Sequence, residues 1–142
     1  MTFQSIHIPK LQVDEALAQS PSVGKHLLEP MKSITAEHGI PMNILEDHAI
    51  ANKAEIHKNK NDLWLCLEGE VIFTCGGELV DPHVKEKNGV RNENELLADS
   101  IRGGMEIILK PGDFLWIPAG EAHQHRCEGT ARLVIIKIPA AI

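Results

Sequence analysis

The sequence has few aromatic residues, few cysteines and no long hydrophobic run. Its 142 residues include two Trp, three Phe and no Tyr, and three Cys. The three cysteines, Cys66, Cys75 and Cys127, are odd in number and widely spaced, which does not match a disulfide framework and is typical of a reducing cytoplasm. No stretch approaches the roughly 20 apolar residues that a membrane-spanning helix needs, and Met1 to Lys10 do not have the pattern of a secretory signal. We therefore expect a cytoplasmic protein.

The sequence also has fewer basic than acidic residues. Fourteen Lys and Arg face 20 Asp and Glu, which gives a net charge of −6. Nucleic acids and anionic membranes attract a clustered positive field, so this composition argues against both as partners. A small molecule bound in a local pocket remains compatible with either sign of charge.

What is present is the pattern of an all-β protein. From about residue 33, short apolar runs alternate with Gly, Pro, Asn and Asp, as in a sandwich or barrel. We expect one domain, with residues 1–32 as a helical or irregular cap segment and residues 33–142 as the β-barrel. Within the cap, short helices are expected at 13–19 and 24–31. The expected strands are 33–37, 42–50, 53–58, 62–68, 70–75, 105–109, 114–117, 122–127 and 131–138.

The segment 76–104 is mostly polar and carries charges of both signs. A loop of this length without structure is uncommon in a compact domain. It is either a hairpin arm or flap at the mouth of the barrel, or a solvated insertion.

Two short stretches hold the residues with the most chemistry. On an extended strand the side chains alternate between faces, so Glu55 and His57 point the same way, as do His123 and His125. By the same rule Asp62, Trp64 and Cys66 share one face of the next strand, opposite three leucines. The leucine face is expected to be an outer packing layer and the other face a partly polar interior.

These stretches resemble the paired motifs of the cupin superfamily. The first motif is His-x-His, three or four residues, Glu, six residues, Gly; this chain keeps the spacing with Glu55, His57, Asp62 and Gly69. The second motif is Gly, five residues, Pro-x-Gly, two residues, His, three residues, Asn. The matching positions here are Gly112, Pro118, Gly120, His123 and, in place of Asn, Cys127. The resemblance implies an all-β double-stranded β-helix (jelly-roll) barrel, and frequently a homodimer.

The resemblance also implies a metal site. Its ligands carry over as His57 and His123 directly, Asp62 as acid for acid, and Glu55 as acid for histidine. Two imidazoles and a carboxylate suit a divalent transition ion such as Zn, Fe, Mn or Ni, and the sequence does not choose among them. Glu55 is a ligand, a general base or a rim acid. His125 is a substitute ligand, a catalytic base, an outer-sphere neighbour or a rim histidine.

Two functions follow from these residues. The first is a metal-dependent enzyme that acts on a small polar molecule, as an isomerase, lyase or dioxygenase, with Glu55 or His125 as catalytic base. The second is a non-catalytic barrel that binds or senses a sugar-like molecule or another metabolite. Cys66 and Cys127 are core fillers or, alternatively, nucleophiles or soft metal ligands, and Trp64 and Trp116 are expected in the core, unless one faces the pocket and stacks on a ligand.

Overall fold

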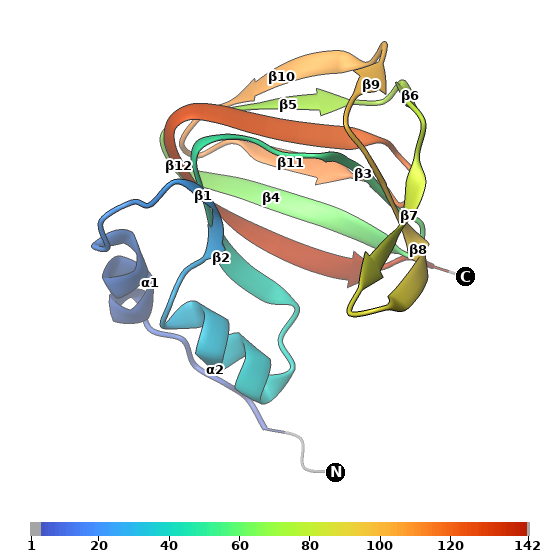
Figure 1. The fold of residues 1–142 in the computed structure, drawn as a ribbon. Helices are drawn as coiled ribbons and strands as arrows, with labels where there is room; N and C mark the ends of the chain where they lie inside the picture. Colours follow the sequence, from blue (N-terminus) through green and yellow to red (C-terminus); the bar gives the residue numbers. More distant parts are fainter. Residues whose placement is uncertain (1–3, 142) are drawn as a thin grey trace.

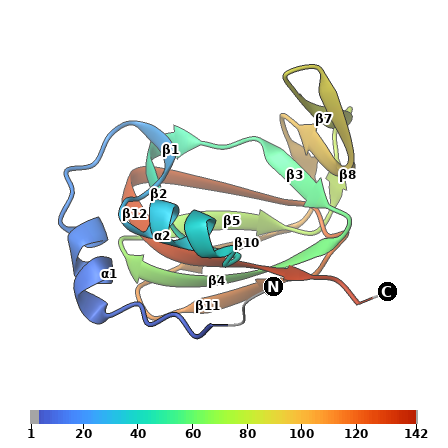
Figure 2. The same cartoon turned by 90° about the horizontal axis from the view of Figure 1, so that it is seen from below.

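A computed structural model describes residues 4–141. Ten of the twelve strands in these residues form an antiparallel sheet that is curled into a barrel, with two short helices on one side (Figures 1 and 2). The other two strands, at residues 78–79 and 101–102, pair as a separate two-stranded sheet. The strands are β1 (Gly24–Leu27), β2 (Met42–Ala51), β3 (Ala54–His57), β4 (Lys60–Glu68), β5 (Val71–Cys75), β6 (Glu78–Leu79), β7 (His83–Lys87), β8 (Val90–Ala98), β9 (Ile101–Arg102), β10 (Met105–Leu109), β11 (Phe114–Ile117) and β12 (His123–Pro139). The expected jelly-roll class is confirmed.

The long strand β12 joins the two halves of the barrel. Its first part pairs with β5, and its second part with β4, while β2 follows it on the other side. The register shifts between Cys127 and Thr130, where the strand bends from one half to the other. The Glu68-Gly69-Glu70 turn approaches this bend so closely that a Cβ on Gly69 would lie 1.9 Å from the carbonyl oxygen of Thr130. Only glycine fits there.

The alternation expected for β4 is confirmed. Asp62, Trp64 and Cys66 are each at most 3% exposed, and the leucines between them are half-buried on the outer side. Trp64 packs edge-on against Phe73 in the barrel core. Trp116 is not in the core as expected: it is 49% exposed, because β11 pairs with β4 so that Trp116 stands beside Leu63 on the outer face.

The N-terminal segment differs in part from the expectation. The first helix is present as α1 (Lys10–Leu17), but residues 24–27 form strand β1 against β2, not a helix. Residues 33–37 belong to helix α2 (Met31–His38), not to a strand. Pro30 is the N-cap of this helix, and Gly39 ends it in the left-handed conformation.

Both helices pack on the outside of the barrel. Ala16 of α1 and Met31 of α2 form a small core with Leu28 and Ile44, separate from the core of the barrel. Neither helix, in the part of the chain that the structure describes, has the length and apolar character to cross a bilayer.

The segment 76–104 is a structured arm. Strands β7 and β8 pair as a hairpin, and β8 pairs in turn with β3, from Ala54–Ala98 to His57–Glu95. The hairpin therefore extends the barrel sheet next to the strand that carries Glu55 and His57 (Figure 1).

Candidate metal centre

Strands β3 and β12 and one turn bring the two motifs together. Glu55 and His57 lie on β3, and His123, the first residue of β12, is the register partner of Glu55. The Pro118–Gly120 turn docks on the end of β3, where the amide of Gly120 donates a hydrogen bond of 2.8 Å to the carbonyl of His57. The spacing of the second motif thus places its histidine beside the first motif.

Glu55, His57 and His123 form the centre of this site. One donor atom from each lies within 4.8 Å of the other two, which defines a group able to hold a metal ion. Glu55 Oε1 is 3.6 Å from Nε2 of His57 and 3.6 Å from Nε2 of His123. The two imidazole rings are 5.0 Å apart between centroids. These three of the four expected ligands do converge.

Both imidazoles are oriented by partners on their far side. His57 Nδ1 is hydrogen-bonded to the carboxylate of Glu95, and His123 Nδ1 donates to the carbonyl of Glu121 at 3.1 Å. An acceptor at Nδ1 places the proton there and leaves the lone pair on Nε2. The Nε2 atoms of both rings therefore face the shared site as potential ligands, as outer partners of metal-binding histidines commonly arrange.

Two buried atoms at this centre have no hydrogen-bond partner within residues 4–141. They are Nε2 of His123 and Oδ2 of Asp62, on side chains that are each 1% exposed. An unsatisfied buried polar atom costs about 1–3 kcal/mol. A bound cation would satisfy both, and imidazole nitrogen with carboxylate oxygen is the donor set that divalent transition ions prefer. The residues present therefore fit the ion that the fold family implies.

Asp62 lies beside the three-residue group and not within it. Its Oδ2 is 3.4 Å from Nε2 of His57 and 3.6 Å from Nε2 of His123. Its Oδ1 accepts a hydrogen bond of 2.8 Å from the ammonium of Lys137, its register partner on β12. One oxygen of Asp62 is thus committed to an ion pair, and the other points to the site.

The electrostatics of the site favour a cation. Burial would raise the pKa of Glu55, but the neighbouring imidazoles of His123 and His57 outweigh it and hold that pKa well below its usual range. Burial opposes ionisation of Asp62 in the same way, and His57 and Lys137 nevertheless lower its pKa. Burial would lower the pKa of His57, yet Asp62 and Glu55 raise it. Two ionised carboxylates thus stabilise positive charge between them.

His125 is not a member of this three-residue group and is held by other partners. Its Nδ1 donates a hydrogen bond of 2.5 Å to Asp47, a fully buried carboxylate that also accepts from the amide of Asn52 at 3.2 Å. Its ring packs against Trp64 and Phe73 at centroid distances of 5.3 and 5.2 Å. His125 belongs to a buried Asp–His pair with Nε2 left for other contacts.

A pocket of about 460 Å³ connects this region with solvent. Glu55, His57 and Trp64 line it together with His125, so one space reaches both the metal centre and the Asp47–His125 pair. The lining also includes Glu95 and Lys85 from the hairpin, and Lys25 and Lys137.

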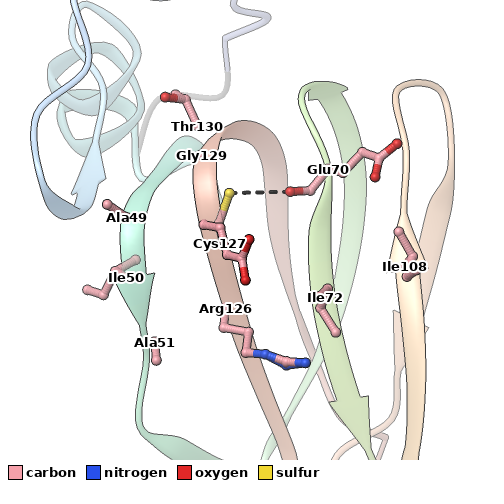
Figure 3. A pocket seen from close by; sticks show the side chains of 11 residues that line it. Ala49, Ile50, Ala51, Glu70, Ile72, Ile108, Arg126, Cys127, Gly129 and Thr130 are labelled. Atoms are coloured by element: carbon pink, nitrogen blue, oxygen red, sulfur yellow. Dashed lines mark hydrogen bonds between the residues drawn. The ribbon is translucent and has the colours of Figure 1, made fainter.

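A larger cavity, of about 770 Å³, lies elsewhere (Figure 3). It is lined by Ile50, Ile72 and Ile108 from three strands, with Arg126 and Glu70 near them. It contains no histidine and none of the converging donors described above, so we assign the chemistry to the smaller pocket.

Cys127 borders this larger cavity, with its thiol turned to the carbonyl of Glu70 at 3.3 Å. Burial raises its pKa, and burial raises the pKa of Cys66 to about 11. Both thiols are buried and protonated, which favours the core-filler interpretation over the nucleophile.

The sequence did not point to Glu95, Lys137 or Asp47. Glu95 and Lys137 face His57 and Asp62 across strand pairs, and strand pairing is not visible in a single sequence. Asp47 had one available signal: it follows Glu46 in a strand, so the two acids point to opposite faces, and a buried acid needs a partner.

Comparisons with known proteins support the fold. No family model and no curated protein matches the chain. Among solved structures, oxalate oxidase in complex with glycolate has a TM-score of 0.50 at 17% identity, over 84% of this chain and 53% of that chain. A predicted oxalate decarboxylase from Thermotoga maritima has 0.49 at 15%, over 82% and 79%. Hydroquinone 1,2-dioxygenase from Sphingomonas sp. TTNP3 with 4-hydroxybenzoate bound has 0.49 at 15%, over 71% and 60%.

The chain spans less than two thirds of the length of the oxidase and dioxygenase chains. At these identities the likeness concerns the fold. Together with the two motifs and the paired strands that carry them, the match to oxalate oxidase shows that this chain has the barrel fold of the cupin superfamily.

Proposed function

We propose that the protein binds one divalent transition ion, of Zn, Fe, Mn or Ni, through Glu55, His57 and His123, and acts on a small polar molecule in the pocket. The observation that carries the proposal is the convergence of these three donors, with each imidazole oriented through its Nδ1. Asp62 is either a fourth ligand or the acceptor for a water molecule bound at the centre. The homodimer expected from the resemblance remains a prediction, and light scattering tests it by measuring the molar mass in solution.

When bound, such an ion supplies Lewis acidity or a site for oxygen, the chemistry of the isomerases, lyases and dioxygenases expected above. The chain supplies the rest. Trp64 and His125 form a wall of the pocket against which a small molecule packs. His125 is the catalytic base of the proposal, because Asp47 fixes its Nδ1 proton and stabilises the imidazolium that forms when Nε2 accepts a proton. Glu55 is better placed as a ligand than as a base, since both imidazoles share its Oε1.

Elemental analysis of protein purified without an affinity tag or chelator tests the metal. We expect about one equivalent of a transition ion per chain, lost in His57→Ala and in His123→Ala. His38→Ala is the matched control, because His38 is exposed at the end of α2, and this variant should keep its metal. Absence of metal after incubation with iron, manganese, nickel and zinc in turn would refute the proposal.

One observation favours the second function, a metal-free binding barrel. The ammonium of Lys137 lies 3.2 Å from Nε2 of His57 and 2.8 Å from Asp62 Oδ1, so a fixed cation already stands beside the donors. In that case the protein retains its ligand without turnover, and replacing His123 changes affinity alone. Metal content together with turnover measurements separates the two functions.

A further inference from the structure

Lysine is concentrated at the pocket of an acidic protein. The chain has ten lysines and a net charge of −6, and four of the ten line this one pocket. They come from four strands far apart in the sequence: Lys25 on β1, Lys60 on β4, Lys85 on β7 and Lys137 on β12. A cluster that depends on the fold in this way gives the pocket a local charge opposite to that of the whole chain.

Most of this positive charge has no partner of opposite sign. Lys137 is paired with Asp62, but within residues 4–141 no ion pair of 4.0 Å or less involves Lys25, Lys60 or Lys85. The two carboxylates in the lining, Glu55 and Glu95, face imidazoles instead. Three ammonium groups therefore remain at the rim, available to a ligand.

The interior of the pocket adds an unused donor. Trp64 lines the pocket, is 3% exposed, and its indole N–H has no acceptor in the described part of the chain. An indole nitrogen can only donate, and so can an ammonium group. Four groups along this pocket that have no partner in the described part of the chain, three ammonium groups and one indole N–H, can therefore only donate, and a ligand with acceptor oxygens would pair with them.

We propose that this pocket takes a small carboxylate, whose oxygens are bound by the rim lysines Lys25, Lys60 and Lys85 and by the Trp64 N–H. The inference names the substrate class for the proposed function, but its observations do not include a metal. A volume of about 460 Å³ admits a small molecule up to the size of a drug, and so has room for lactate or benzoate but not for a polymer. A carboxylate also brings a negative charge to the ammonium groups, so both partners of each hydrogen bond are charged, whereas a neutral molecule of the same shape offers them only a neutral oxygen.

Calorimetric titration with matched pairs tests the charge of the ligand. The probes are lactate against lactamide and benzoate against benzamide, on the full chain with and without added metal. We expect at least one carboxylate to bind about tenfold more tightly than its amide, with an affinity that falls as salt is raised. Equal affinity of acid and amide, or no binding of any probe, would overturn the inference.

Variants test the residues. The triple change Lys25→Gln, Lys60→Gln, Lys85→Gln should weaken carboxylate binding about tenfold, whereas Lys110→Gln, at an exposed turn outside the pocket, should not. Trp64→Phe keeps a ring and removes the N–H, and we expect a loss of about fivefold; Trp116→Phe, on the outer face, is its control. If the pocket variants lose no more affinity than these controls, the inference is wrong.

The outcome is separable from that of the proposed function. Carboxylate selectivity in a protein that binds no metal refutes the metal proposal and keeps this one. One equivalent of bound metal without any preference for carboxylates keeps the metal proposal and refutes this one.

Discussion

Glu95 and His57 stand opposite each other on β8 and β3, and the carboxylate of Glu95 is hydrogen-bonded to Nδ1 of His57. The hairpin that the sequence shows only as a polar segment thus supplies the residue that orients His57, a ligand of the proposed metal centre. The same strand pairing closes one side of the pocket. The 76–104 segment therefore contributes residues to the pocket and does not only extend the sheet.

Glu95→Gln tests this relationship. An amide holds the imidazole less firmly in its tautomer and makes Nε2 less basic, so metal affinity should fall about 10- to 100-fold. Glu93→Gln is the control, because Glu93 lies on the same strand but is exposed and paired with Arg91. A competition titration with a metal indicator gives both affinities. If the two variants bind metal equally well, Glu95 has no orienting role.

Lys137→Met should raise the affinity for the metal ion. The ammonium of Lys137 holds Asp62 Oδ1 and lies 3.2 Å from Nε2 of His57, so it repels a second cation at the centre. We expect tighter metal binding and, in the metal-free protein, a loss of about 1–3 kcal/mol of stability, since Asp62 loses its partner. The indicator titration and urea unfolding measure the two effects. Weaker metal binding in this variant would mean that the ammonium supports the metal centre.

The three cysteines are expected to be unreactive in the folded protein. Burial raises the pKa of Cys66 and of Cys75 to about 11, and raises that of Cys127. At pH 8 a thiol with a pKa of 11 is a thiolate in roughly one molecule in a thousand, and the thiolate is the species that reacts. A thiol reagent should therefore label three cysteines in denaturant and almost none in the native state. Fast labelling of Cys127 in the native protein would contradict this expectation and support Cys127 as a nucleophile.

Some of the site was predictable because it depends on local rules. Strand alternation placed Asp62, Trp64 and Cys66 together inside the barrel, and this rule needs only the order of residues along one strand. His57 and His123 lie on different strands, and their meeting was expected from the resemblance to the paired cupin motifs.

The remainder depends on pairing between strands and on tertiary context. Glu95 and Lys137 could not be assigned, because no local rule says which strand lies next to which. In the N-terminal part, Ile34 and Thr35 have β-branched side chains that favour a strand, yet they lie in α2. There the apolar face of the helix, with Met31 and Thr35 one turn apart and buried, outweighs the local preference.

Arg132 is the residue whose loss should destabilise the protein most clearly. Its guanidinium is buried, donates to Glu46 Oε1 at 2.9 Å, and reaches the carbonyls of Leu17 and Gln19 at 2.7 and 2.5 Å. It therefore joins the end of α1 to the barrel, and its removal leaves the buried Glu46 carboxylate without its charge partner.

For Arg132→Ala we expect a loss of about 3–5 kcal/mol in the free energy of unfolding, the cost of breaking a buried pair from one side. Arg126→Ala is the control on the same strand, because the ion pair of Arg126 with Glu106 is exposed and worth at most about 1 kcal/mol. Arg132→Lys should recover little of the loss, since a single ammonium cannot reach the carboxylate and both carbonyls as the planar guanidinium does. Urea unfolding of the three variants measures these differences. Equal stability of the Arg132→Ala and Arg126→Ala proteins would show that α1 is held to the barrel by its apolar contacts alone.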